Sequence, residues 1–173
     1  MVKTTKVIFL DFDGVLNTGK YQRRLREKGE NWYDDYGPLF DPEAVANLRM
    51  VLDAVPDARL VISSTWKIDG LAFLRNLWED RGMPGIIHGV TPDCASDLTD
   101  VDLSDPDNIA ALAGKGGEVK AWLEENASKD CRYVIFDDTE YFFEDQMPHL
   151  VRTRPLDGIL EEDARRAVRI LTD

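Results

Sequence analysis

The sequence predicts a single α/β domain with a central parallel sheet flanked by helices. Three short, continuous apolar runs, at 7–10, 60–62 and 133–136, each end at small or acidic polar residues. Runs of this kind are typical of strands buried on both faces of a parallel sheet. Helical patterns separate them, which favours right-handed βαβ crossovers. A chain of 173 residues suits one domain, so we expect 1–173 to fold as one unit.

The helices and weaker strands follow from local signals. Pro42 and Glu43 come directly after a capping carboxylate, and apolar residues then recur at helical spacing. Gly82 is expected to end the second helix. Weaker strand signals lie at 86–87 and 150–151. Three helices are expected after Asp41, after Asp69 and after the pair 116–117, and a fourth is expected to begin around Glu161 and Glu162.

Two segments interrupt this alternation and are expected to form small cap or lid insertions, at about 17–40 and 91–113. The first is aromatic and polar, and the second is rich in Asp. Long insertions after strand ends often serve as binding loops. Basic residues gather between Lys20 and Lys28. They form either an electropositive entrance for an anionic substrate or a solvated helix face.

Composition excludes several classes of protein. The formal net charge of -12 disfavours non-specific binding to nucleic acid or anionic membranes. No run approaches the ~20 apolar residues of a membrane span, and the run at 7–10 is too short for a signal-peptide core. A cytoplasmic protein without a membrane partner is therefore expected. Cys94 and Cys131 cannot form a disulfide framework and are expected to be buried, reduced thiols.

Polar side chains follow each of the three strong strands. The pairs are Asp11 and Asp13, Ser63 and Ser64, and Asp137 and Asp138. The carboxyl ends of parallel strands line the ligand crevice of an open sheet. Two carboxylates ~4 Å apart repel by about 4 kcal/mol at an effective dielectric of ~20, so the cluster requires a cation. Oxygen ligands without His or Cys select a hard ion, and Mg²⁺ is the usual one beside phosphate.

The spacing of Asp11 and Asp13 suits phosphoryl transfer. Residues i and i+2 at a strand end point the same way, so one carboxylate can attack phosphorus while the other protonates the leaving oxygen. Gly14 then lets the backbone turn sharply. Ser63 can bind phosphate oxygens, and Lys115 at a helix start can supply positive charge.

Each signal also has a purely structural interpretation. An Asp-x-Asp-Gly sequence alone is often only a turn. The segment 63–65 can simply cap a helix, and Lys115 can be an ordinary solvated lysine. Asp138 can cap a helix. Trp66 is expected either to stack on a base or to pack in the core.

Taken in order, these motifs resemble the haloacid dehalogenase (HAD) superfamily of phosphohydrolases. The matching features are the segment 11–17 (DFDGVLN), the strand ending at Ser63, Lys115 and the pair 137–138. Further details resemble the small HAD domains associated with nucleic-acid repair proteins; they lie at 63–66, 89–92, 115–123 and 155–171. The resemblance implies a Rossmann-like HAD fold with minimal cap insertions.

The resemblance also implies a mechanism through an aspartyl phosphate on Asp11, with Asp13 as general acid and then general base. Mg²⁺ would be held by Asp11, the backbone carbonyl of Asp13 and Asp137, with Asp138 in direct contact with the ion or beside its ligands. The expected phosphate-binding residues are Ser63, Ser64 and Lys115, with Lys120 as the alternative lysine.

The expected function is Mg²⁺-dependent hydrolysis of phosphomonoesters. An open site and the resemblance to repair domains favour a nucleotide or a nucleic-acid terminal phosphate as substrate, whereas the acidic charge does not. The alternatives are a phosphatase for a sugar or another small metabolite, and a catalytically silent module that binds a phosphorylated partner.

Overall fold

A computed structural model describes residues 3–94, 104 and 114–173, and it has the expected α/β fold. Its main sheet has five strands in the order β5-β4-β1-β6-β7, and every neighbouring pair is parallel. The strands are β1 (Thr4–Leu10), β4 (Arg59–Ile62), β5 (Ile87–Val90), β6 (Ala127–Asp137) and β7 (Leu150–Arg152). The two weaker strand predictions are thus confirmed as β5 and β7.

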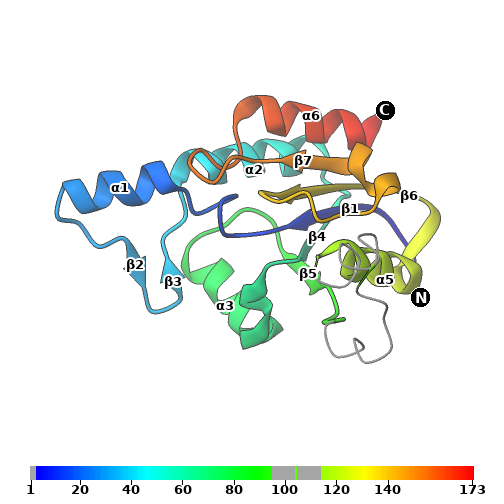
Figure 1. Cartoon of the computed structure of the whole chain (residues 1–173), viewed down its shortest axis with the longest axis horizontal. Helices are drawn as coiled ribbons and strands as arrows, with labels where there is room; N and C mark the ends of the chain where they lie inside the picture. Colours follow the sequence, from blue (N-terminus) through cyan, green and yellow to red (C-terminus); the bar gives the residue numbers. More distant parts are fainter. Residues whose placement is uncertain (1–2, 95–103, 105–113) are drawn as a thin grey trace.

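Helices cover both faces of this sheet (Figure 1). The helices are α2 (Pro42–Ala54), α3 (Leu71–Asp80), α5 (Gly116–Asn126) and α6 (Glu161–Thr172). Ile8 and Leu10 of β1 face a core formed with α2, α3 and α6, whereas Val7 and Phe9 face a second core formed with α5. This burial on both faces explains the continuous apolar run of β1.

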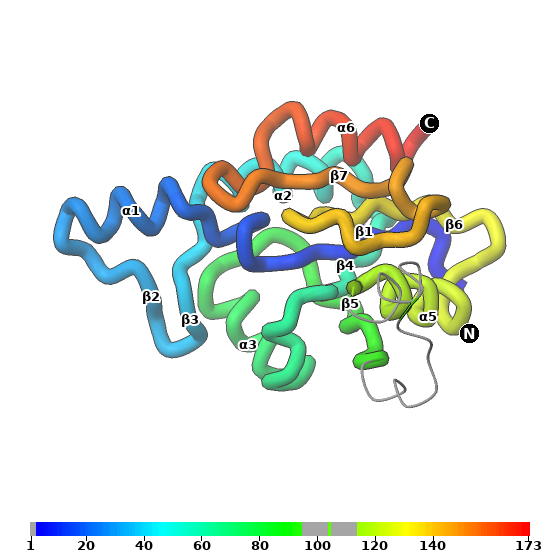
Figure 2. The backbone as a smooth tube through the Cα atoms, viewed as in Figure 1, coloured from blue at the N-terminus to red at the C-terminus, as the bar shows by residue number. Residues whose placement is uncertain are grey.

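The first insertion forms a helix and a hairpin. Helix α1 (Gly19–Glu27) is followed by two short antiparallel strands, β2 (Tyr33–Asp34) and β3 (Gly37–Pro38). Figure 2 shows α1 and the hairpin extending from the sheet at one end of the molecule. Of the second insertion, residues 95–103 and 105–113 lie outside the described part of the chain.

One predicted helix start is correct and another is wrong. Asp41 caps α2 by accepting a hydrogen bond from the backbone N–H of Glu43 at 2.9 Å. Asp69, by contrast, is the last residue of a 3₁₀ helix, η1 (Thr65–Asp69), and Gly70 occupies the N-cap position of α3 without a side-chain cap. The 3₁₀ turn takes up the residues that were expected to lead into α3.

Two further expectations concern the surface. No helix in the described part of the chain is both long and apolar enough to cross a membrane. Cys94 and Cys131 form no disulfide, but both are partly exposed, so the expectation that they are buried is wrong. A second 3₁₀ helix, η3 (Glu144–His149), precedes β7 and completes the described elements.

Candidate active site

Strand register brings three polar residues to one edge of the sheet. Leu10 of β1 pairs with Ile62 of β4 on one side and with Phe136 of β6 on the other. The residues that follow these positions are Asp11, Ser63 and Asp137, and all three are buried. The backbone N–H of Ser63 donates to Leu10 O at 2.9 Å, and that of Asp11 to Phe136 O at 3.1 Å. The ladder therefore fixes the relative positions of the three side chains.

Lys115 lies between two of these carboxylates. Its Nζ atom is 2.7 Å from Asp11 Oδ2 and 2.7 Å from Asp137 Oδ2. Lys115 immediately precedes α5, and that helix directs it toward the sheet edge. Lys120 lies further along α5 with its ammonium group 5.8 Å from the centre of the Phe143 ring. The structure thus brings Lys115, and not Lys120, to the carboxylates.

Asp138 completes a cluster of three carboxylates. One oxygen from each of Asp11, Asp137 and Asp138 lies within 4.8 Å of the others. Gly14 makes room for this arrangement: its φ is +73°, and a Cβ atom there would lie 2.4 Å from Asp138 Oδ2. An all-oxygen donor set of this kind fits a hard divalent cation. The resemblance implies that Asp13 contributes its backbone carbonyl to the same ion, and its side chain is hydrogen-bonded to Asn17 and Trp66.

Burial and neighbouring charges shift the pKa values of the residues in this cluster. Burial raises the pKa of Asp11 to about 6, against the opposing effect of Lys115, and Asp137 adds to the rise. Burial alone would lower the pKa of Lys115, but Asp11 and Asp137 outweigh it and raise that pKa above its ordinary value. Burial and the neighbouring Asp137 raise the pKa of Asp138. These directions are those of buried groups with an excess of negative charge.

Asp13 is held at both of its carboxylate oxygens. Asn17 Nδ2 donates to Oδ1 at 2.7 Å, and Trp66 Nε1 donates to Oδ2 at 3.2 Å. Asp13 is itself exposed at the end of β1. It is therefore held in a fixed orientation at the solvent side of the buried cluster, close enough for its charge to contribute to the raised pKa of Asp138.

The two serines at the end of β4 have different surroundings. Ser64 is buried, and its Oγ accepts a hydrogen bond from the backbone N–H of Trp66, which caps η1. Ser63 is also buried, but its Oγ has no hydrogen-bond partner within the described part of the chain. A buried hydroxyl without a partner is available to a ligand. The helix-capping role predicted for this segment is therefore that of Ser64, whereas the Ser63 hydroxyl is free to donate a hydrogen bond to a ligand.

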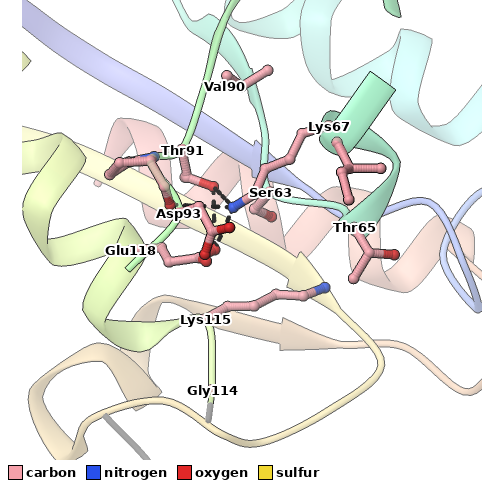
Figure 3. A pocket seen from close by; sticks show the side chains of 11 residues that line it. Ser63, Thr65, Lys67, Val90, Thr91, Asp93, Gly114, Lys115 and Glu118 are labelled. Carbon is pink, nitrogen blue, oxygen red and sulfur yellow. Dashed lines mark hydrogen bonds and ion pairs between the residues drawn. The ribbon is translucent and has the colours of Figure 1, made fainter. Parts of the chain in front are cut away.

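A cavity of about 550 Å³ adjoins Ser63 and Lys115. Figure 3 shows the Lys67 side chain reaching Thr91 and Glu118 on one side of it, while Lys115 points away from that group. Lys67 Nζ lies 2.6 Å from Glu118 Oε2 and 3.1 Å from Thr91 Oγ1. The polar pair of Lys67 and Glu118 joins η1 to α5 beside the site.

Several supporting residues were not assigned a role from the sequence. Thr139 donates to Asp137 Oδ1 through its backbone N–H at 2.9 Å and its hydroxyl at 2.8 Å. Thr153 is buried, and its hydroxyl donates to the carbonyl oxygen of Gly14 at 2.8 Å. The only sequence signal for Thr139 was its position two residues after Asp137, because an Asp carboxylate often accepts a hydrogen bond from the backbone N–H two residues further on.

The basic residues of the first insertion lie on α1 and just after it. Arg23, Arg24 and Lys28 are exposed, whereas Lys20 forms an ion pair with Glu43 at 3.1 Å. Arg26 lies over the Trp32 ring, 4.3 Å from its centre. The exposed members fit a solvated face, and their role toward a substrate stays a prediction.

A parallel sheet whose strand ends carry an Asp-x-Asp pair, a serine and a second pair of aspartates, with a lysine between them, defines a domain of the HAD class. The family model for the HAD domain in Swiss Army Knife RNA repair proteins matches residues 7–164. The chain therefore belongs to this family, which confirms the predicted resemblance.

The fold is also similar to a solved structure, the HAD domain of the effector protein Lem4 from Legionella pneumophila. The two share 14% sequence identity with a TM-score of 0.54, over 98% of this chain and 97% of that chain. At this identity the likeness shows the fold alone. A comparison with curated proteins found no match.

Proposed function

We propose that this chain is a divalent-cation-dependent phosphomonoesterase that works through an aspartyl phosphate on Asp11. The observation that carries the proposal is the convergence of Asp11, Ser63, Lys115 and Asp137 at one sheet edge, with Asp13 two residues beyond the nucleophile. A module that only binds phosphate has no need of both a nucleophile and an oriented second carboxylate.

The chemistry divides between two carboxylates. Asp11 attacks phosphorus as the bond to the leaving oxygen breaks, and Asp13 donates its proton to that oxygen. Asp13 then removes a proton from the water that hydrolyses the aspartyl phosphate. The Ser63 hydroxyl and the Lys115 ammonium group bind the phosphoryl oxygens. In this proposal the Ser64 hydroxyl does not bind phosphate, because it caps η1 directly after Ser63.

Asp11, Asp137 and Asp138 are the residues proposed to hold Mg²⁺, together with the backbone carbonyl of Asp13. Their oxygen-only donor set and mutual proximity support this assignment. When bound, the ion neutralises the carboxylates and the phosphoryl group so that two anions can approach each other. Thr139 orients Asp137 for this purpose.

Nucleotides or nucleic-acid terminal phosphates are the proposed substrates. The description of the family names RNA repair proteins. The exposed basic residues Arg23, Arg24 and Lys28 can attract a polyanion despite the net charge of -12.

A small-molecule phosphatase is the second candidate, and one observation favours it. The cavity of about 550 Å³ beside Ser63 and Lys115 is of the size that binds a metabolite. Thr91, Lys67 and Glu118 line this cavity, and their side chains offer hydrogen-bonding groups to a sugar or a base.

Phosphate release with Mg²⁺ tests the proposal. The substrates are an aryl phosphate, mononucleotides, a sugar phosphate and oligonucleotides phosphorylated at either terminus. Asp11→Asn is expected to lose roughly a thousandfold or more of the activity, whereas Asp130→Asn, an exposed residue in the first half of β6, should retain it. A nucleic-acid end as substrate predicts a salt-sensitive KM for the oligonucleotides.

The outcomes separate the candidates. Preference for the sugar phosphate, with no dependence of KM on salt, would favour the small-molecule phosphatase. Phosphate binding without release from any substrate, by folded protein that binds Mg²⁺, would contradict the proposal and leave the silent binding module.

A further inference from the structure

Trp66 is the residue that joins Asp13 to the rest of the domain. The indole Nε1 donates to Asp13 Oδ2 at 3.2 Å from η1, across 53 positions of sequence. Asn17, which holds the other oxygen, lies in the same local turn as Asp13. An exposed carboxylate without such contacts samples several rotamers. The contact with Trp66 therefore ties the side chain to β4 and η1, and not only to its own turn.

The indole ring is itself held in place. The backbone N–H of Trp66 donates a hydrogen bond to Ser64 Oγ, which fixes the backbone at the start of η1. The ring centre lies 5.3 Å from that of Phe12 in an edge-on arrangement, and 5.9 Å from that of Phe40 in a tilted one. Phe12 and Phe40 are both buried. Packing of this kind leaves the Nε1–H aimed at Asp13 with little freedom to turn away.

The hairpin of the first insertion closes on the same ring. Gly37 of β3 has a φ of +131°, and a Cβ atom there would lie 3.0 Å from Trp66 Cη2, so only glycine lets the hairpin backbone approach this closely. Arg81, at the end of α3, holds the hairpin in that position. It makes a bidentate pair with Asp34 at 2.7 and 3.0 Å and donates to the carbonyl oxygens of Gly37 and Pro38.

We propose that Trp66 is a positioning residue for Asp13, and that the hairpin holds the Trp66 ring in the position that this requires. The proposal rests on the proposed function, in which Asp13 protonates the leaving oxygen. A proton donor must lie within hydrogen-bond distance of that oxygen in the transition state, and a displacement of about 1 Å can cost about a hundredfold in rate. Trp66 thus acts through Asp13 and touches no reacting atom.

Trp66→Phe tests this directly, because it keeps an aromatic ring and removes the Nε1–H donor. The assay measures the rate of the first step, release of the leaving alcohol in the first turnover. It compares phenyl phosphate, whose leaving group needs a proton, with dinitrophenyl phosphate, whose leaving group does not. We expect this rate to fall about tenfold to a hundredfold for phenyl phosphate and to change little for dinitrophenyl phosphate. Steady-state turnover is not the readout, because Asp13 also acts as the base in the second step, which both substrates share.

Trp78→Phe is the matched control. Trp78 also contacts Phe12, with ring centres 6.1 Å apart, and its Nε1 donates at 2.9 Å to Pro84 O instead of to Asp13. This variant loses the same chemical group from the same aromatic cluster. It should show no dependence of its activity loss on the leaving group.

A double-mutant cycle with Asp13→Asn, measured on dinitrophenyl phosphate and phenyl phosphate, completes the test. If Trp66 acts through Asp13, Trp66→Phe should cause no further loss in the Asp13→Asn background. The inference would be overturned by a loss of the first-turnover rate in Trp66→Phe that is equal for both leaving groups, that Trp78→Phe reproduces, or that persists in the Asp13→Asn background. Wild-type protein without activity on either substrate would instead contradict the proposed function itself.

Discussion

Replacing Lys115 with methionine removes the ammonium group that lies 2.7 Å from both Asp11 and Asp137 and keeps most of the apolar stem. The two carboxylates are 7% and 0% exposed at the side chain, so water cannot take over the role of the cation. At ~4 Å and an effective dielectric of ~20, one such attraction is about 4 kcal/mol, before the cost of desolvating the ammonium group.

The net effect on stability is smaller than the sum of two attractions. Removing one partner from a buried ion pair costs about 3–5 kcal/mol, because an uncompensated charge stays buried. Lys115 is 20% exposed at the side chain, which places the expectation at the lower end. We therefore expect Lys115→Met to lower the free energy of unfolding by about 3 kcal/mol at neutral pH without divalent cations.

The loss should depend on pH in a defined direction. Burial already raises the pKa of Asp11 to about 6, and Lys115 opposes that rise. Without Lys115 the folded-state pKa of Asp11 moves further above its unfolded value. The native state then binds a proton at a higher pH than it does in the wild type, so the stability of Lys115→Met should recover toward the wild-type value as the pH falls through the variant's raised pKa toward about 6.

Urea unfolding measures these changes, with Lys120→Met as the matched control. Lys120 is exposed and lies away from the carboxylates, so its replacement should change the free energy of unfolding by less than about 0.5 kcal/mol. Added Mg²⁺ should stabilise Lys115→Met more than the wild type, because the ion supplies the missing charge. If Lys115→Met proves as stable as Lys120→Met at neutral pH, Lys115 does not neutralise the cluster and the reasoning is refuted.

Three further predictions concern the surroundings of the site. Gly14→Ala should lower the free energy of unfolding by at least about 1–2 kcal/mol in urea titrations, because its φ of +73° is unfavourable for alanine and the added Cβ would lie 2.4 Å from Asp138 Oδ2; an unchanged midpoint would contradict this. Thr139→Val removes the hydroxyl bond to Asp137 and should raise the Mg²⁺ concentration for half-maximal activity by about tenfold to a hundredfold, whereas an unchanged requirement would count against Asp137 as a ligand. Arg81 holds the pKa of Asp34 below its usual range, so the stability that this pair contributes is lost as the pH falls below the ordinary carboxyl pKa. Below about pH 4 the unfolding temperature of Asp34→Asn should therefore depend less on pH than that of the wild type, and parallel curves would refute this.

The strands could be predicted because burial on both faces leaves a signal in the local sequence. The runs at 7–10, 60–62 and 133–136 became the inner parts of β1, β4 and β6, since strands with helices on both faces have apolar residues at every position. The polar residues at the ends of these runs then converge because parallel strands point the same way. This part of the site follows from topology alone.

The remainder depends on contacts between distant segments. The bond from Trp66 to Asp13 spans 53 positions, and the pair of Arg81 and Asp34 spans 47. No periodicity or spacing predicts such pairs, because they depend on how η1 lies against the segment after β1 and on how the first insertion packs against α3. The expected Asp69 cap was wrong for a related reason: local sequence favoured a cap there, but the 3₁₀ turn after β4 used the residue.

The most direct test of the account is a rapid-quench experiment on the intact protein with Mg²⁺ and dinitrophenyl phosphate. If Asp11 is the nucleophile, protein quenched in acid during turnover will carry one phosphoryl group, peptide mapping will place it on Asp11, and hydroxylamine will remove it. Asp11→Asn should carry none. Phosphate release by wild-type protein without any phosphorylated Asp11, or with undiminished release by Asp11→Asn, would contradict the central claim.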